Sequence, residues 1–155
     1  MEKTLIIFKP SAMERGFVGQ IINRFQQKGL VICGIKMMQL DEKILREHYA
    51  HLVDKSFFPV LLKSMMASPV IVMCLAGKDV INVVRLMTGA TNGREALPGT
   101  IRGDFSASNQ ENVIHASSSP EDAAAEIKRF FNDGEIFEWT PANLRYVYSE
   151  LEVNQ

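Results

Sequence analysis

The segment N-V-I-H-A-S at residues 112–117 contains the side chain with the clearest chemical potential, His115. An imidazole with an orienting carboxylate is the minimum set of groups for a nucleophile or a general base. If this segment is a strand, Ser117 lies on the same face as His115, because strand side chains alternate. Glu126 on the following predicted helix is the candidate carboxylate, and Asn112 adds a neutral donor and acceptor. A histidine beside valine and isoleucine is also often a hydrogen-bonded core residue, so both interpretations stay open.

Basic side chains suited to phosphate oxygens gather in and just before residues 88–112. Arg94 and Arg102 lie in this stretch, and Arg85 precedes it. Planar guanidinium groups bind phosphate through paired hydrogen bonds. Neither G-x-x-x-x-G-K-[ST] nor G-x-G-x-x-G occurs, so no glycine-rich phosphate motif supports this interpretation. The alternative is that these arginines are solvated surface groups, as charged residues usually are.

Two further pairs of residues have candidate chemistry. His48 and His51 stand at positions i and i+3 of a predicted helix and could share a metal ion. No third ligand follows at zinc-like spacing, so we expect no metal-binding residue. Phe57 and Phe58 could form a stacking platform for a nucleobase, although we expect at least one of them in the core.

The composition favours one neutral domain covering residues 1–155. Lys and Arg number 17 against 18 Asp and Glu, so the net charge is −1. Proteins that coat nucleic acids or membrane surfaces usually need a basic excess, which argues against both classes. No segment approaches the ~20 apolar residues of a membrane span, and the first apolar run is too short for a signal peptide. Cys33 and Cys74 lie in apolar runs typical of buried free thiols, so we expect a cytoplasmic protein.

Apolar runs and periodicity predict the elements that must position these side chains. Helices are expected where apolar residues recur at helical spacing, with caps at Asp41, Ser56, Asp79 and Ser119. The stretch 88–112 shows almost no periodicity, and loops this long are usually functional or disordered. Residues 132–155 form a mixed tail with Trp139, Tyr146 and Tyr148. The predicted strands are 5–8, 30–40, 70–75 and 113–117; the predicted helices are 18–28, 41–52, 56–65, 79–87 and 119–131.

Without the additional helices the order is β-α-β-β-α-β, which is typical of the ferredoxin-like α+β fold. We therefore expect a four-stranded antiparallel sheet with helices on one face, extra helices and a long loop at 88–112. This fold supports many unrelated functions, so it does not identify the chemistry.

The whole chain resembles the nucleoside diphosphate kinases. The ordered, spaced matches make chance similarity a poor explanation. They are T-L-I-I-F-K-P-S from residue 4, E-R-G-F-V-G-Q-I-I-N-R-F from 14, H-Y at 48–49, F-F-P-V-L-L at 57–62, T-G-A-T-N at 88–92, P-G-T-I-R-G-D-F at 98–105 and N-V-I-H-A-S at 112–117.

The resemblance implies that His115 takes the γ-phosphoryl group of a nucleoside triphosphate and passes it to a diphosphate in a ping-pong cycle. It assigns Glu126 and Ser117 to holding the imidazole, and Lys9 and Asn112 to the ribose hydroxyls, with Lys9 also near the transferred phosphate. The long loop becomes a nucleotide-binding loop, and magnesium arrives on the nucleotide phosphates. The remaining implied roles are phosphate binding by Arg85, Thr91 and Arg102, base stacking by Phe57, and shaping of the site by Tyr49 and Leu61.

The resemblance also implies a homo-oligomer. Residues 132–155 are similar to the C-terminal extension of the hexameric family members, so a hexamer is favoured over a tetramer. Three departures from the family pattern stand at Ser11, Gly93 and Ser118, where the family usually has Asp, Pro and Asp. None removes a catalytic group. If the backbone at Gly93 suits proline, we expect Gly93→Pro to stabilise the fold.

Two classes of function remain to be distinguished. The first is the phosphotransferase that the resemblance implies. The alternative is a non-catalytic ferredoxin-like module that binds nucleic acid or another protein. Such a module predicts an excess of exposed basic and aromatic residues on the sheet, and the net charge of −1 argues against it.

Overall fold

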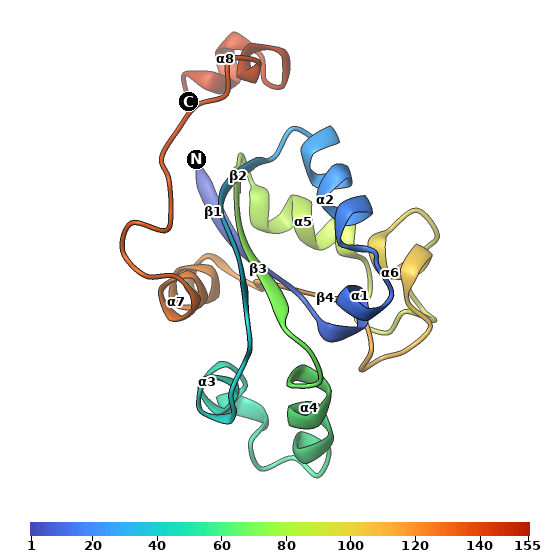
Figure 1. Cartoon of the computed structure of the whole chain (residues 1–155). Helices are drawn as coiled ribbons and strands as arrows, with labels where there is room; N and C mark the ends of the chain where they lie inside the picture. Colours follow the sequence, from blue (N-terminus) through green and yellow to red (C-terminus); the bar gives the residue numbers. More distant parts are fainter.

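The computed structural model describes all 155 residues and contains one antiparallel sheet with the strand order β2-β3-β1-β4 (Figure 1). This sheet and the β-α-β-β-α-β order confirm the ferredoxin-like α+β prediction. The four predicted strands are all present. Their bounds are β1 Glu2–Phe8, β2 Val31–Met38, β3 Val70–Gly77 and β4 Ile114–Ala116.

Strand β1 lies inside the sheet and pairs with both β3 and β4. Its residues Leu5 to Phe8 are fully buried, because side chains on both faces of the strand are covered. This two-sided burial explains the continuous apolar run in place of alternation. The strand ends at Lys9, and Pro10 opens the short helix α1 (Pro10–Glu14), which sequence analysis did not predict.

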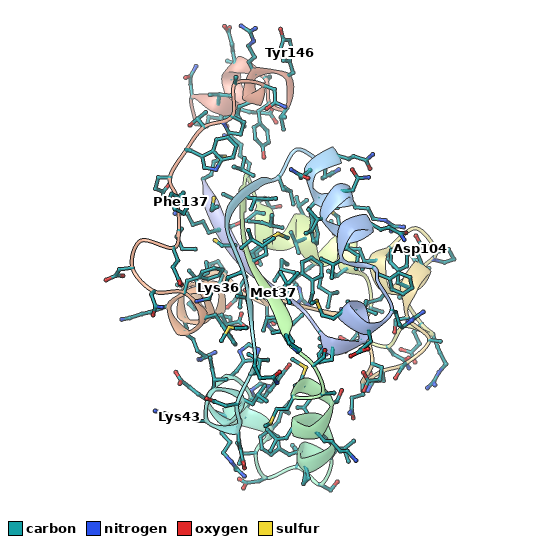
Figure 2. The ribbon with its side chains drawn as sticks, viewed as in Figure 1. Lys36, Met37, Lys43, Asp104, Phe137 and Tyr146 are labelled. Carbon is teal, nitrogen blue, oxygen red and sulfur yellow. The ribbon has the colours of Figure 1, made fainter.

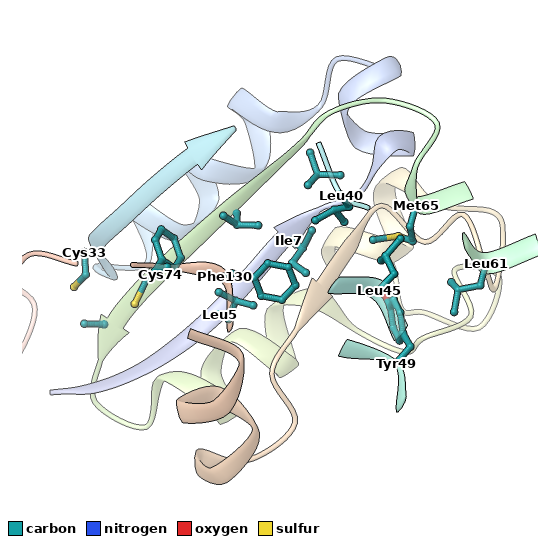
Figure 3. Packing of buried hydrophobic residues seen from close by; sticks show 14 of the residues in the cluster. Leu5, Ile7, Cys33, Leu40, Leu45, Tyr49, Leu61, Met65, Cys74 and Phe130 are labelled. Carbon is teal, nitrogen blue, oxygen red and sulfur yellow. The ribbon is translucent and has the colours of Figure 1, made fainter. Parts of the chain in front are cut away.

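The two helices of the β-α-β-β-α-β order lie on one face of the sheet, as expected, and the additional helices cover the other face (Figure 1). On the first face, helices α2 (Val18–Gln27) and α5 (Val80–Thr88) pack against Ile6 and Phe8 of β1. On the second, Leu5 and Ile7 pack against the additional helices. Figure 3 shows this second core, with Leu45, Met65 and Phe130 among its labelled members. The helices of the second face are α3 (Glu42–His48), α4 (Phe58–Met65) and α7 (Pro120–Phe130).

Two of the four predicted caps form, and two do not. Asp41 accepts a hydrogen bond from the backbone N–H of Ile44 at 2.8 Å, and Ser119 accepts from that of Asp122 at 3.1 Å. The Ser56 cap was wrong, because α4 begins later, with Phe57 at its N-cap and a proline in its first turn. Asp79 occupies the N-cap in a left-handed conformation (φ 49°), where its carboxylate accepts from the Asn82 amide and caps no backbone group.

The helix expected over residues 41–52 is divided. Helix α3 ends at His48, and a short 3-10 helix, η1 (Ala50–Leu52), follows. Tyr49 stands between them with φ −107° and ψ 33°, outside helical geometry. The break leaves His48 at the C-terminal end of α3, beside the sheet face that α7 also covers.

Residues 88–112 contain the helix α6 (Ile101–Phe105), which periodicity did not reveal. Thr100 caps this helix by accepting from the backbone N–H of Gly103 at 3.0 Å. Glycine is required at position 103, because a Cβ there would lie 1.9 Å from the carbonyl oxygen of Leu97. The loop is therefore an ordered, closely packed segment.

The chain after α7 runs along β2 and then to the periphery of the molecule (Figure 1). Phe137 donates its backbone N–H to Cys33, and the Trp139 indole donates to the Ile32 carbonyl at 2.9 Å. Tyr146 lies far out on this tail (Figure 2) and is 77% exposed. The tail ends with η2 (Leu144–Tyr146) and α8 (Glu150–Val153). No helix of the structure combines the length and apolar character needed to cross a membrane.

Gly93 has no room for a side chain, so the expected benefit of Gly93→Pro is reversed. A Cβ would lie 2.3 Å from the Ser106 carbonyl oxygen, and the Gly93 N–H donates to Ser108 at 3.0 Å. We predict that Gly93→Pro lowers the free energy of unfolding by about 1–3 kcal/mol, since it adds a clash and removes that donor. Urea titration measures the change.

The matched control is Gly19→Ala in α2, where a Cβ meets nothing within 4 Å. We expect this variant to be neutral or up to about 1 kcal/mol more stable. An unchanged or higher urea midpoint for Gly93→Pro would contradict the packing described above.

Candidate active site

His115 is the middle residue of β4, the shortest strand. The pairing of β4 with β1 continues past its end through Ser117. The Ser117 N–H donates to the Leu5 carbonyl at 3.2 Å, and its hydroxyl oxygen accepts from the Leu5 N–H at 3.1 Å. Because Ser117 is fully buried, these bonds fix the strand that carries His115.

Glu126 of α7 is hydrogen-bonded through Oε2 to Nε2 of His115. Burial of Glu126 favours its neutral form, but the hydrogen bond to His115, the nearby Ser117 hydroxyl and the charge of Arg129 outweigh this and lower its pKa. The carboxylate therefore stays ionised and orients the ring. The His115 side chain is 20% exposed, and Nδ1 makes no hydrogen bond. Nδ1 is thus the ring nitrogen that is free to act as a nucleophile.

The backbone immediately before His115 is strained. Val113 has φ 63°, a region that β-branched residues rarely occupy. The Ile114 N–H donates to the Asn112 carbonyl at 2.8 Å, which is the i to i+2 bond of a γ-turn. The Lys9 N–H holds the Val113 carbonyl at 3.0 Å. A residue in such a backbone conformation costs on the order of 1–3 kcal/mol of folding free energy, and such residues occur mainly at functional sites.

Arg102 of α6 connects three segments through carbonyl groups. It donates to Gly89 at 3.1 Å, Asn112 at 3.3 Å and Ile114 at 2.7 Å. Burial, followed by the charge of Arg85, lowers the pKa of Arg102 to about 10, so it stays charged at neutral pH. These bonds hold the 88–112 loop against the strand that carries His115.

Lys9 donates to the side-chain oxygen of Asn112 at 2.6 Å. The Asn112 amide nitrogen donates to the carbonyls of Thr91 and Asn109 at 3.0 and 2.9 Å. Burial and then the charge of Arg102 lower the pKa of Lys9 to about 8, while Glu111 partly opposes this. A poorly solvated ammonium group is thus held near His115.

A cavity of about 860 Å³ opens between the loop, α3 and α7, and most of the predicted site residues line it. Of the others, Ser117 is buried behind the cavity wall, Phe57 is 46% exposed, and Leu61 packs in the core with Phe58. One of the two adjacent phenylalanines is thus core, as expected. The predicted residues that line the cavity are Lys9, Tyr49, Arg85, Thr91, Arg102, Asn112, His115 and Glu126.

Sequence analysis missed two side chains beside the His115–Glu126 pair. The His48 ring meets the His115 ring edge to face, with centroids 4.6 Å apart. Arg129 of α7 donates to Nδ1 of His48 at 3.0 Å. Helical spacing places Arg129 on the face of α7 that carries Glu126, and this i, i+3 relation was the available signal. His51, considered with His48 as a metal pair, is exposed at the rim of the cavity.

His48, His115 and Glu126 offer ligand atoms within 4.8 Å of one another. We assign no metal to them, because the Arg129 guanidinium already donates to a His48 nitrogen and would repel a cation. The cavity lining instead combines Lys9, Arg85 and Arg102 with a nucleophilic nitrogen. Such a set binds an anion with several oxygens, such as a phosphate chain, and can accept a group from it.

Comparison with known proteins gives consistent matches over nearly the whole chain. The family model described as nucleoside diphosphate kinase matches residues 2–136. The nucleoside diphosphate kinase of Parabacteroides distasonis is 54% identical over 152 residues, covering 98% of this chain and 99% of that protein. The Archaeoglobus fulgidus enzyme of the same name is 44% identical over 150 residues, covering 97% and 99%.

Solved structures agree with the sequence relatives. A halophilic nucleoside diphosphate kinase from Halobacterium salinarum, in complex with CDP, superposes with a TM-score of 0.92 at 38% identity. The match covers 95% of this chain and 98% of that one.

Removing the Ser117 hydroxyl should destabilise the protein. We predict that Ser117→Ala lowers the free energy of unfolding by about 1–3 kcal/mol, because the buried N–H of Leu5 loses its acceptor. Urea titration measures the loss, and Ser118→Ala is the matched control, since Ser118 is exposed. Equal midpoints for the two variants would show that the hydroxyl does not anchor the strand.

Proposed function

This chain belongs to the nucleoside diphosphate kinase family, and we propose that it transfers the γ-phosphoryl group of a nucleoside triphosphate to a nucleoside diphosphate through His115. The observation that carries this assignment is the cavity in which a free imidazole nitrogen faces three cationic side chains. The relative bound to CDP, a nucleoside diphosphate, supports the substrate class.

The reaction is a ping-pong exchange with a phosphohistidine intermediate. Nδ1 of His115 forms a bond to the γ-phosphorus, and the bond to the bridging oxygen breaks as the nucleoside diphosphate leaves. Glu126 accepts the Nε2 proton in a hydrogen bond and stabilises the positive charge that develops on the ring. A second diphosphate then attacks the phosphorus, and His115 returns to its starting state.

Lys9, Arg85 and Arg102 supply the positive charge that the transferring group needs. Phosphoryl transfer depends mainly on positioning and charge stabilisation, which these side chains provide without a glycine-rich phosphate motif. Thr91 adds a hydroxyl on the loop side. The nucleotide enters as its magnesium complex, because Mg²⁺ keeps several waters and binds phosphate oxygens with few protein ligands.

The remaining roles follow the family pattern. Lys9 and Asn112 bind the ribose hydroxyls. Phe57, whose ring is half exposed beside α4, stacks on the base, while Tyr49 and Leu61 support the site from the core. Neither the comparisons nor the site supports the alternative, a non-catalytic binding module.

The domain and its location complete the proposal. Residues 1–155 form one nucleoside diphosphate kinase domain, in which 132–155 is a C-terminal extension. The cytoplasm suits the protein, since both cysteines are free, buried thiols that need no oxidising compartment.

The C-terminal extension favours a homo-oligomer, with a hexamer preferred to a tetramer. Phe137, Trp139, Tyr146 and Leu151 are between 52% and 78% exposed in the single chain. Apolar side chains gathered in one exposed segment are typical of an association surface. A neighbouring subunit of the same kind would bury them.

His115 should carry the phosphoryl group. Incubation with labelled ATP alone should yield a label on His115 that is stable in alkali and lost in acid. We predict that His115→Ala abolishes both labelling and turnover, because no other side chain presents a free nucleophilic nitrogen supported by Glu126. In the control, His51→Gln, the label should remain. Labelling that persists in His115→Ala would contradict the assignment.

Base selectivity should be shallow, because stacking tolerates every base. We predict that Phe57→Ala weakens ATP, GTP, CTP and UTP by similar factors, equivalent to about 1–3 kcal/mol for one stacked base. Equilibrium binding of the four nucleotides measures this. Met66→Ala, at the far end of the same helix, is the control. A loss confined to one base would contradict the stacking role.

Light scattering on the full chain should give the mass of a hexamer. The mass of a tetramer would still support a homo-oligomer. We predict that Tyr146→Ser weakens association, since it removes the exposed ring of the tail (Figure 2). Lys43→Ser, on an exposed part of α3, is the control. A monomer at micromolar concentration would overturn the oligomer proposal.

A further inference from the structure

We propose that Arg129 is a positioning residue for the phosphoryl transfer, because its hydrogen bond to His48 reserves the Glu126 carboxylate for His115. The proposal concerns how the site keeps its nucleophile oriented, and it rests on the proposed function. It follows from a competition between two imidazoles for one carboxylate oxygen.

Oε2 of Glu126 has two histidine neighbours. Nε2 of His115 is hydrogen-bonded to it, and Nδ1 of His48 lies 3.5 Å away. The side chains of His48 and Glu126 are 2% and 8% exposed, so no bulk water separates them. A proton on His48 Nδ1 would make that nitrogen a second donor toward Oε2. A small rotation of the carboxylate would then weaken its bond to His115.

Arg129 removes this competitor by fixing the tautomer of His48. A guanidinium group only donates hydrogen bonds and keeps its charge. Since its Nη1 lies 3.0 Å from His48 Nδ1, that nitrogen must accept with its lone pair. The proton of the neutral ring is therefore on Nε2, which is buried without a partner. Leaving a buried donor unpaired is unfavourable, so the arrangement needs the charged bond from Arg129 to compensate.

Arg129 is itself held in place. Its Nε lies 3.3 Å from a carboxylate oxygen of Glu47, on the helix that carries His48. The Arg129 side chain is 17% exposed, so it is partly shielded from solvent. This ion pair joins α3 to α7, although the buried Nε makes no hydrogen bond.

Charged and titratable groups from every neighbouring element face His48. They are His115 on β4, Lys9 after β1, His51 in η1, Arg129 and Glu126 on α7, and Glu47 on the same helix. Burial first, and then the neighbouring His115, Arg129, Lys9 and His51 side chains, lower the pKa of His48 to about 2. The ring therefore stays neutral at working pH, and Arg129 decides which nitrogen holds its proton.

The main test is Arg129→Met, which keeps the apolar stem and removes the donor and the charge. Nitrogen chemical shifts of the His48 ring at pH 7.5 report the tautomer directly. We expect the Nε2–H form in the wild type and the Nδ1–H form in Arg129→Met. This readout does not depend on activity, so it judges the proposal even if the protein forms no phosphohistidine.

Rapid-mixing measurements of His115 phosphorylation by ATP give the second readout. We expect Arg129→Met to slow phosphorylation about tenfold, the scale of one lost hydrogen bond to a charged group, with KM little changed. The factor should be the same from pH 7.5 to 6, because burial keeps the His48 ring neutral over that range and only its tautomer changes. Arg129→Lys keeps a charged donor and should restore the rate to within about twofold.

Lys128→Met is the matched control, since it removes a positive charge from an exposed neighbouring position of α7. It should leave both the tautomer and the rate of His115 phosphorylation unchanged. An Nδ1–H tautomer in the wild-type protein would overturn the proposal without any variant. It is equally overturned if Arg129→Met keeps the Nε2–H tautomer, or phosphorylates His115 as fast as the wild-type protein.

Discussion

The hydrogen bond between His115 and Glu126 connects the sheet to helix α7, and the geometry of the site depends on it. It occupies one imidazole nitrogen and leaves the other free toward the cavity. For this to happen, β4 must lie beside β1, and α7 must cover the second face of the sheet. Ser119 sets the start of α7, so that Glu126 falls two turns into the helix, where its carboxylate reaches the strand.

Arg102 organises the opposite wall of the cavity in a different way. Residues 88–112 have little regular structure, so their carbonyl groups lack the partners that a sheet or long helix would supply. One guanidinium satisfies two of them, at Gly89 and Asn112, and also the carbonyl of Ile114 in β4. The same burial that lowers the pKa of Arg102 and Lys9 leaves both cations poorly solvated. An incoming phosphate chain therefore meets charges that have already lost much of their water, which strengthens the attraction.

The strands were predictable because their signal is local. The runs at Leu5–Phe8 and Val70–Leu75 are apolar without interruption, and both belong to strands covered on two faces. Helix α6 was missed because its stability comes from the Thr100 cap and from packing, with no periodic apolar face. The sheet face that the additional helices cover was not predicted, because the ferredoxin-like order does not specify where such helices pack.

For the site, Glu126 could be paired with His115 from strand alternation and helix order. Helical spacing could place Arg129 on the Glu126 face of α7, but its contact with His48 could not be predicted, because it joins positions 81 apart in the sequence. Proline does not fit at Gly93 because a side chain there would contact Ser106. This contact, too, could not be predicted from the local sequence.

The central place of β1 has a consequence for synthesis of the protein. β1 leaves the ribosome first, yet one partner strand begins at Val70 and the other at Ile114. Leu5 and Ser117, whose mutual hydrogen bonds close the sheet, are 112 positions apart. Until that second strand emerges, β1 lacks one of its two partner strands, and its apolar residues are exposed to aggregation. The nucleophile therefore comes into place only when the sheet is complete, so no shorter nascent chain has an assembled active site.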